Sequence, residues 1–414
     1  MPQSEAQPEA QPDAPTPSVS TAHPTRRCFL HAGLPKTGTS YLQSVFWNSR
    51  DALSQQRFEL LPQRRQDHLN LALCIRDIVG SFDDPFVRGA PQRLTRQLAL
   101  STATTVLVTQ EALAPATTEQ AGVLLELLDG FDVHVVVTAR DLARQVPSAW
   151  QQRIQARLSD MEEEFYAAVR DRAPGSADFW ANQDLTAVTA RWAAAVGPDH
   201  VHVVTCPPAG TDTSVLFARF CSVVGVDPGA LDTATPTDNV ALGRAQAELQ
   251  RRVNVALGDR FPHSRAGYLR LGQSYLAGKV LGRQRGDRAR LPESLRPWVE
   301  EVTADWLQQL STEGYDVVGD LADLQPTADA FDSSPAPVTD AELVDVAATA
   351  LADILEIRDR ELDEGAATRR ELDQLRAQGS PSPQRPAPGR WTPNRVAGGV
   401  RRRAGRAWRS LSRR

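Results

Sequence analysis

The sequence predicts an α/β fold in which a mostly parallel β-sheet is covered by helices on both faces. Short β-branched or apolar runs recur at residues 28–31, 105–109, 133–138 and 201–205. Long segments with helical periodicity separate these runs, and a glycine-containing turn joins the first run to the first helix. Buried strands that alternate with helices are typical of parallel sheets, because each crossover lays a helix on a sheet face.

The helices follow in chain order from the same periodicity. Apolar residues recur at three- and four-residue spacing, which is the pattern of a helix with one buried face. Helices are therefore predicted over residues 39–47, 120–128, 143–158 and 185–195, and after the last strand over residues 243–256 and 295–310.

Shifts in composition divide the 414 residues into six parts. A lead rich in Pro, Ala, Gln and Glu covers residues 1–25 and is predicted to be disordered. One globular domain is predicted over residues 26–326, followed by a linker over residues 327–338. Residues 339–378 have the pattern of one or two helices that could self-associate. A Pro-rich linker over residues 379–389 then leads to a basic amphipathic tail over residues 390–414.

Cysteine usage and hydropathy favour a cytoplasmic protein. The four cysteines form no Cys-x-x-Cys pair and have no metal-site spacing with histidine, which fits thiols that are kept reduced. The N-terminus lacks the apolar run of a signal peptide, and no stretch is long enough to span a bilayer. The net charge of -5 is small and excludes no class of partner.

The segment at residues 28–40, CFLHAGLPKTGTS, has the pattern of a P-loop-type phosphate-binding turn. A buried strand leads through the turn to a helix start, where backbone N–H groups attract an anion. Gly33 and Gly38 let the backbone approach phosphate oxygens. The hydroxyl groups of Thr37, Thr39 and Ser40 can donate further hydrogen bonds to the same anion.

The lysine of this turn argues against an ordinary nucleotide triphosphatase. A Walker A loop has lysine directly after its second glycine, whereas Thr39 follows Gly38 here and Lys36 lies two residues before it. The segment would also fit an ordinary strand–turn–helix connection that binds no ligand.

A second phosphate-binding pattern follows the strand predicted over residues 133–138. Arg140 ends that strand, and Ser148 lies eight residues later. A guanidinium offers a fork of donors to phosphate, and the hydroxyl adds one more. Taken alone, Arg140 would fit an ion pair with Asp141 or with a helix carboxylate, and Ser148 would fit a helix interior. Both motifs in this order in one chain favour a joint anion site.

Together the two motifs closely resemble those of sulfotransferases that use 3'-phosphoadenosine 5'-phosphosulfate (PAPS), and bacterial sulfotransferase-like proteins in particular. The resemblance covers residues 27–326 and implies a sulfotransferase domain that releases adenosine 3',5'-bisphosphate. It implies that Arg140 and Ser148 hold the 3'-phosphate, although this chain has Arg-Asp-Leu where the family often has Arg-Asn-Pro or Arg-Asp-Pro. The residues that match the family's phosphate loop are Pro35, Lys36, Thr37, Gly38, Thr39 and Ser40.

Weaker resemblance extends to residues 185–207, 239–243 and 248–254. Sulfotransferases also close a late basic loop over the 3'-phosphate, and residues 282–290 fit such a loop, with Arg283 and Arg285 as the candidate contacts. A solvated basic turn would have the same composition.

Sulfuryl transfer resembles in-line phosphoryl transfer, so the protein must stabilise charge on the leaving phosphate, a role implied for Lys36. The chemistry requires no metal, and we expect none. The acceptor must lose a proton to a base. Glu111, which follows the strand at residues 105–109, and His68 are the two candidates, by analogy with the carbohydrate and small-molecule branches of the family. Glu111 would also fit a helix cap, and His68 a surface or core histidine.

The acceptor is expected to be a carbohydrate or glycolipid, because the loop lacks the tryptophan that follows it in many small-molecule enzymes of the family. The tail over residues 390–414 has nine arginines and no acid, with Val400, Trp408 and Leu411 on one face if it is helical. Such a helix fits peripheral contact with the inner membrane face, although nucleic-acid binding or a solvated tail would also fit. A kinase-like phosphotransferase and a non-catalytic adaptor are the alternative functions.

Overall fold

The computed structural model describes residues 26–80, 83–234, 242–260 and 265–379. The chain divides into two compact units, Met1–Ile354 and Leu355–Arg414. The predicted lead over residues 1–25 and the predicted tail over residues 390–414 lie outside the described residues, as does the Pro-rich linker apart from residue 379.

A six-stranded sheet forms the centre of the first unit, and every neighbouring pair in it is parallel. Its order is β2-β3-β1-β4-β5-β7. This confirms the predicted fold class and the four predicted strands. The strands are β1 (Arg26–His31), β2 (Phe58–Leu60), β3 (Thr105–Thr109), β4 (Phe131–Ala139), β5 (Val201–Thr205) and β7 (Asp316–Val318).

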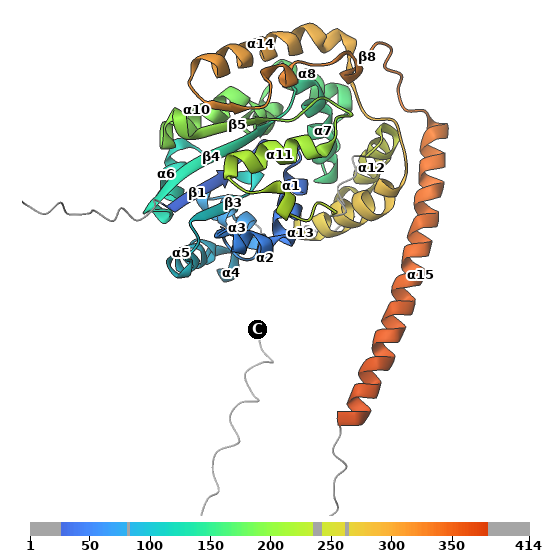
Figure 1. The fold of residues 1–414 in the computed structure, drawn as a ribbon. Helices are drawn as coiled ribbons and strands as arrows, with labels where there is room; N and C mark the ends of the chain where they lie inside the picture. Colours follow the sequence, from blue (N-terminus) through green and yellow to red (C-terminus); the bar gives the residue numbers. More distant parts are fainter. Residues whose placement is uncertain (1–25, 81–82, 235–241, 261–264, 380–414) are drawn as a thin grey trace, which may run out of the picture. The chain divides into compact units, whose positions relative to one another are not determined.

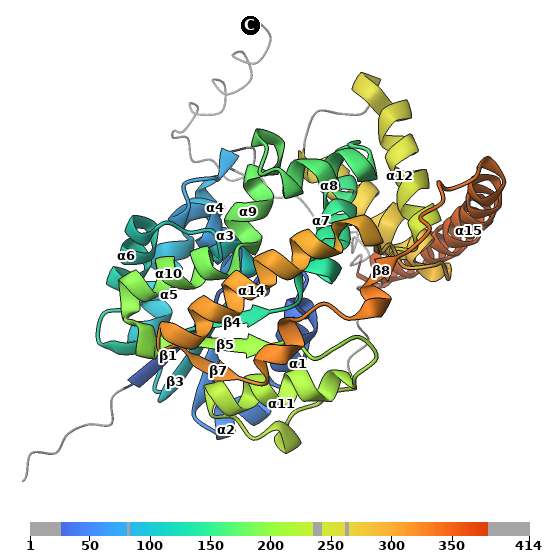
Figure 2. The ribbon, with the colours of Figure 1, turned by 90° about the horizontal axis from the view of Figure 1, so that it is seen from above.

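Helices cover both faces of this sheet (Figure 1). Figure 2 shows α11 on one side of the strands and α10 on the other. Among the described residues, no helix combines the length and the apolar character needed to cross a membrane. The helices are α1 (Thr39–Asn48), α2 (Arg50–Gln55), α3 (Arg65–Ile75), α4 (Pro85–Arg88), α5 (Ala90–Leu100), α6 (Thr118–Leu127), α7 (Leu142–Gln155), α8 (Glu162–Arg170), α9 (Ala177–Gln183), α10 (Leu185–Val196), α11 (Thr213–Val224), α12 (Arg244–Leu257), α13 (Arg265–Tyr268), α14 (Arg296–Thr312) and α15 (Asp340–Gly379).

A core of aromatic side chains fixes α1 and α11 on one face of the sheet. Phe46 of α1 and Phe220 of α11 pack edge to face with ring centroids 5.4 Å apart, and both belong to the same buried cluster as Phe29 of β1. Burial of each ring contributes about 2 kcal/mol or more to folding. This packing holds the start of α1 at the carboxyl end of β1, where ligands gather in parallel α/β sheets.

The globular unit extends further along the chain than the predicted boundary at residue 326. The predicted linker contains β8 (Phe331–Asp332), which pairs in parallel with β6 (Leu291–Pro292). The first turns of α15 also belong to this unit, and Leu343 is buried there with 6% of its surface exposed. The sequence did not indicate that the unit continues here, because residues 327–338 are rich in Pro, Ser and Asp, as linkers are.

Candidate functional site

A polar cleft of about 780 Å³ lies at the carboxyl edge of the sheet. It receives the turn after β1, the residues that follow β3 and β4, one face of α7 and the start of α11. Apart from Pro35 and the ring of Tyr41, its lining is polar, charged or glycine. The lining residues are Pro35, Lys36, Gly38, Thr39, Ser40, Tyr41, Glu111, Arg140, Ser148, Gln151, Gln152, Gln155, Asp212, Thr213, Ser214, Thr233 and Gln273.

The turn between β1 and α1 adopts a left-handed backbone at two positions. Lys36 has a φ of 69° and Gly38 a φ of 84°, and α1 begins directly afterwards at Thr39. A left-handed backbone costs a residue with a side chain roughly 1 kcal/mol or more, so the surroundings must hold Lys36 in place. No side chain caps the N-terminus of α1 at Gly38. The positive end of this helix therefore lies at the cleft without a capping side chain among the described residues.

Buried polar groups beneath the turn hold Lys36 in its left-handed conformation. The Thr37 hydroxyl donates to the carbonyl of Leu34 at 2.6 Å and lies 2.6 Å from the Thr138 hydroxyl. Thr138 in turn lies 3.3 Å from Nε2 of His31. Thr37 is buried, with 1% of its surface exposed. Its hydroxyl holds the turn from below and does not line the cleft, in contrast to the predicted donor role.

Two glutamines tie the turn from the other side. The Pro35 carbonyl accepts hydrogen bonds from Nε2 of Gln145 at 2.9 Å and from Nε2 of Gln183 at 3.2 Å. The Cys206 thiol donates to the carbonyl of Thr37 at 3.3 Å. The turn is thus anchored to α7, α9 and the end of β5.

Lys36 carries a charge that the described protein leaves without an ion-pair partner. Burial lowers the pKa of Lys36, the positive charge of Arg140 lowers it further, and the carboxylate of Glu111 partly offsets both effects. Arg140 and Glu111 are therefore close enough to Lys36 to act on its charge. No ion pair within 4.0 Å involves Lys36 in the part of the chain that the structure describes.

Arg140 lies in the same cleft and is also without a carboxylate partner among the described residues. Its NH2 group donates to the Ser148 hydroxyl at 3.0 Å and to the carbonyl of Arg144 at 2.9 Å. Its Nε atom is buried and has no hydrogen-bond partner among the described groups. Burial is the main cause that lowers the pKa of Arg140, to about 10. The partly buried guanidinium therefore retains a donor that an anion could use.

Asp141 does not neutralise Arg140, which was the structural alternative for that arginine. The Asp141 carboxylate caps α7 by accepting from the backbone N–H of Arg144 at 2.9 Å, and it also pairs with the Arg144 guanidinium. Asp141 is thus paired with Arg144 and forms no ion pair with Arg140, although its negative charge raises the pKa of Arg140 and partly offsets the effect of burial.

Glu111 lies in the cleft, on the turn that follows β3. Its Oε2 accepts a hydrogen bond from Nε2 of Gln43 on α1 at 3.1 Å, and it lines the cleft together with Lys36 and Arg140. A carboxylate that is oriented by an amide and faces the cleft has the placement that a base needs.

His68 lies outside the cleft lining and is occupied by backbone groups. Its Nδ1 accepts from the N–H of Thr109 at 3.1 Å, so Nε2 carries the proton and donates to the carbonyl of Pro62 at 2.8 Å. Burial lowers the pKa of His68 to about 4. Uptake of a proton would break the bond to Thr109, and the structure therefore gives His68 a structural place rather than the predicted candidacy as base.

The late basic loop differs from its prediction. Arg283 and Arg285 are exposed, and neither lines the cleft. The charge of Arg288 does reach Arg140, whose pKa it lowers. Arg288 is thus the arginine of this loop that the structure brings into electrostatic contact with the site. The weaker resemblance at residues 239–243 falls largely outside the described residues.

Several cleft residues were not predicted from the sequence. Gln151, Gln152 and Gln155 lie one and two turns after Ser148 on α7. Helical spacing from Ser148 could have found them, because residues three, four and seven positions apart share a helix face. Asp212 begins α11 and caps it by accepting from the N–H of Ser214 at 2.8 Å. Only the fold brings that helix start to the cleft.

Comparisons of the chain with family models, with curated proteins and with solved structures find no match.

Proposed function

We propose that this chain is a sulfotransferase that moves the sulfuryl group of PAPS to a hydroxyl or amine of an acceptor. One observation carries the proposal. Two partly buried cations, Lys36 and Arg140, face the same cleft, and neither forms an ion pair with a described residue. Leaving a charge desolvated and unpaired is costly, so such a pair is retained where a ligand supplies the opposite charge.

The nucleotide has anionic groups at both ends that suit the two cations. Lys36 and the start of α1 would hold the 5' phosphosulfate, with Thr39 and Ser40 as further contacts. Arg140, with its buried Nε, and Ser148 would hold the 3'-phosphate. Arg288 would add charge on that side, in the place that the sequence motif gave to Arg283 and Arg285.

The chemistry then requires one positioned base. In the transfer, the acceptor oxygen forms a bond to sulfur while the bond from sulfur to the 5'-phosphate oxygen breaks. Negative charge grows on that phosphate, where Lys36 would stabilise it. Glu111 would take the acceptor proton, because its carboxylate lies in the cleft beside Lys36. The products are the sulfated acceptor and adenosine 3',5'-bisphosphate.

The lining of the cleft favours a hydroxyl-rich acceptor such as a carbohydrate or the head of a glycolipid. Small-molecule pockets are usually lined mainly by apolar side chains. Here Gln152, Gln155 and Gln273 offer amides that can both donate and accept hydrogen bonds, while the amide of Gln151 already donates to the carbonyl of Leu242 at 2.9 Å. Hydroxyl groups of a sugar would satisfy such a surface, whereas a flat apolar acceptor would leave these amides unpaired.

The test is a titration of adenosine 3',5'-bisphosphate, without added metal, followed by calorimetry and by thermal unfolding. Wild-type protein should gain about 2.7 kcal/mol of stability when the ligand is present at 100 times its Kd. Arg140→Ala should lose at least 10-fold in affinity, because each charge-assisted bond to phosphate contributes roughly 1.5–3 kcal/mol. Arg288→Ala should lose less, and Arg283→Ala should bind like wild type.

Arg283→Ala is the matched control, since it removes an exposed arginine of the same loop. Equal losses from Arg283→Ala and Arg140→Ala would show bulk charge attraction and not a built site. Binding that requires Mg²⁺ and prefers a nucleoside triphosphate would favour a kinase-like phosphotransferase instead.

A further inference from the structure

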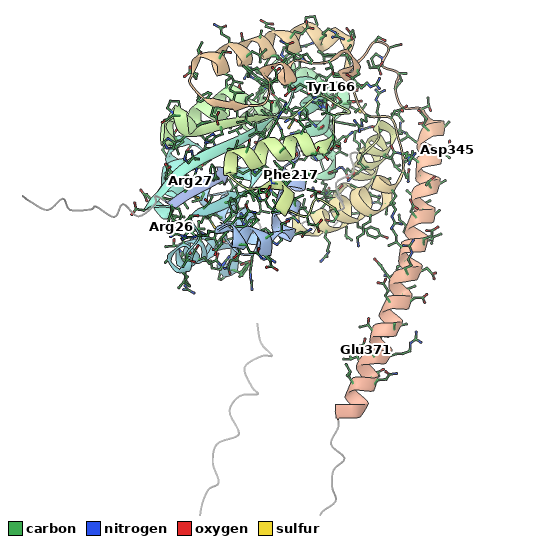
Figure 3. The ribbon with its side chains drawn as sticks, in the orientation of Figure 1. Arg26, Arg27, Tyr166, Phe217, Asp345 and Glu371 are labelled. Carbon is green, nitrogen blue, oxygen red and sulfur yellow. The ribbon has the colours of Figure 1, made fainter. Side chains whose placement is uncertain are left out.

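A second cluster of ligand-type side chains lies at the opposite edge of the sheet, where β4 and β5 begin. Asp132 and His134 are near the start of β4, and His200 directly precedes β5. Figure 3 labels Arg26 and Arg27 at the start of β1, and Arg27 is in register with Asp132. The cluster therefore lies at the amino edge of the sheet, away from the cleft that Lys36 and Arg140 line.

Three donor atoms in this cluster converge. The two oxygens of the Asp132 carboxylate lie 3.1 Å from Nε2 of His134 and 3.0 Å from Nε2 of His200. One donor atom from each of the three residues lies within 4.8 Å of the other two. Zinc bonds of 2.0–2.2 Å at tetrahedral angles separate neighbouring donors by roughly 3.3 Å, so small adjustments would accommodate one ion.

The hydrogen bonds of the neighbouring histidine fix the proton of His134. Nδ1 of His202 lies 2.6 Å from the Asp316 carboxylate and must donate to it. A neutral His202 then accepts at Nε2 from Nδ1 of His134, at 2.9 Å. A neutral His134 consequently turns the lone pair of Nε2 toward the anionic oxygen of Asp132. That arrangement is repulsive unless a positive charge lies between the two atoms.

The ring of His200 also has more carboxylate neighbours than protons to donate. Its Nδ1 lies 3.3 Å from Asp199 and its Nε2 lies 3.0 Å from Asp132, so a neutral ring with one proton cannot satisfy both carboxylates. A cation bound between these ring nitrogens and the Asp132 carboxylate would offset the repulsion.

The surroundings also orient the two rings as outer groups do at metal centres. His134 stacks on Phe29 with ring centroids 5.3 Å apart, and its Nδ1 bonds to His202, which Asp316 holds. Asp199 lies beside Nδ1 of His200. A ligand histidine in proteins usually donates its second nitrogen to such a partner, which fixes the ring and raises its basicity.

We propose that Asp132, His134 and His200 bind one divalent cation of borderline softness, with Zn²⁺ as the best fit. Two imidazoles and one carboxylate are a ligand set that Zn²⁺ favours and that Mg²⁺ and Ca²⁺, which prefer oxygen, do not. All three side chains are partly exposed, so water can complete the coordination. The ion would join β4 to β5 and is independent of the sulfotransferase chemistry.

Linear spacing did not reveal this site. Asp132 and His134 are two residues apart and share a sheet face, but His200 directly precedes a different strand, β5. Only the pairing of β4 with β5 brings the three together.

The test is calorimetric titration of Zn²⁺ into tag-free, EDTA-treated full-length protein, repeated with Co²⁺, Mg²⁺ and Ca²⁺. Wild type should bind one Zn²⁺ per chain, bind Co²⁺ more weakly, and bind Mg²⁺ and Ca²⁺ far more weakly still. Asp132→Asn and His200→Gln keep the side-chain volume and should each weaken Zn²⁺ binding by at least 100-fold. His202→Gln should weaken it by roughly 10–100-fold, the usual cost of an outer partner.

Two controls isolate the cluster. Cys74→Ser removes the half-buried thiol, and Arg140→Ala alters the cleft; both should bind Zn²⁺ like wild type. The proposal is overturned if wild type binds no Zn²⁺, if Mg²⁺ binds as tightly as Zn²⁺, or if Asp132→Asn and His200→Gln retain full affinity. Circular dichroism of each variant without metal shows whether it is folded, and loss of metal binding counts only in a folded variant.

Discussion

At the scale of single residues, the main feature of the cleft is that some of its charged side chains form ion pairs with described residues and others do not. Asp141 neutralises Arg144, its neighbour three positions along α7, while Arg140 keeps a buried Nε without a partner among the described groups. Lys36 is held in a left-handed conformation by contacts to its neighbours in the turn. Holding two cations at one cleft in this way therefore lowers the stability of the folded protein.

The first prediction at this scale concerns the base. Glu111→Gln keeps the shape and the contact to Gln43 but removes the proton acceptor, so turnover with PAPS and an accepted sugar should fall 10²- to 10⁴-fold. Its Kd for adenosine 3',5'-bisphosphate should stay within a few-fold of wild type. Steady-state kinetics and calorimetry measure the two effects separately.

His68→Gln is the control for that measurement. Glutamine can accept from Thr109 and donate to Pro62 as the histidine does, so turnover should persist. If His68→Gln abolished turnover while Glu111→Gln kept it, the two roles assigned to these residues would be reversed.

Short motifs predicted Lys36 and Arg140 because each follows a strand that the hydrophobic pattern also predicts, and Ser148 because it lies a fixed eight residues after Arg140. The direction of a side chain in a turn could not be predicted in this way, because it depends on contacts with other elements. Thr37 turns inward because Thr138, from another strand, offers its hydroxyl a partner. The charge of Arg288 acts on Arg140, although Arg288 is exposed like Arg283 and Arg285, and this effect depends on how the loop packs. Sequence carries no local signal for either outcome.

At the scale of elements, close packing between β1 and β4 sets the path of the phosphate turn. A Cβ at Gly33 would lie 2.0 Å from Oγ1 of Thr138 and 2.6 Å from Nε2 of His31. Gly33→Ala should therefore destabilise the fold by about 1–3 kcal/mol and displace the turn, which should weaken nucleotide binding as well. Urea denaturation and ligand titration measure the two effects.

Gly122→Ala is the matched control. Gly122 lies inside α6, and a Cβ there meets nothing within 4 Å. Alanine should stabilise this helix by roughly 0.5–1 kcal/mol and leave nucleotide binding unchanged. A Gly33→Ala protein as stable as wild type would contradict the packing described beneath the turn.

Element boundaries were predicted best where both faces of an element are buried. β3 and β5 have the predicted bounds, since continuous apolar runs mark strands covered on both sides. The edge strands β2 and β7 were missed, because each has three residues and no alternation long enough to read. The predicted helix over residues 143–158 ends earlier, at Gln155, and the chain then turns through Arg157 with a φ of 81°.

At the scale of the whole molecule, the two candidate sites lie at opposite edges of the sheet and differ in the side chains that form them. Its carboxyl edge gathers Lys36 and Arg140, which form no ion pair with a described residue, and its amino edge gathers imidazoles and a carboxylate. Parallel strands produce this separation, because every strand presents its end to one edge and its beginning to the other. The sequence allowed the first site to be predicted because its motifs are contiguous, whereas the second depends on pairing between strands.

The extent of the globular unit leads to the last prediction. The start of α15 is bound to the preceding fold: Asp340 pairs with Arg252 at 3.1 Å, the carbonyl of Val346 accepts from Gln284 at 3.3 Å, and Leu343 is buried. A chain that ends at residue 338 should lose about 2–3 kcal/mol from Leu343 alone and melt several degrees lower.

A chain that ends at residue 354 keeps all three contacts. It should melt close to the full-length protein and bind adenosine 3',5'-bisphosphate with unchanged affinity, because the cleft residues and their anchors precede residue 280. Differential scanning calorimetry of the two truncations compares these cases directly. Equal melting temperatures for both would mean that the contacts of α15 contribute nothing to the unit, and the boundary would then return to the end of the Pro- and Ser-rich segment.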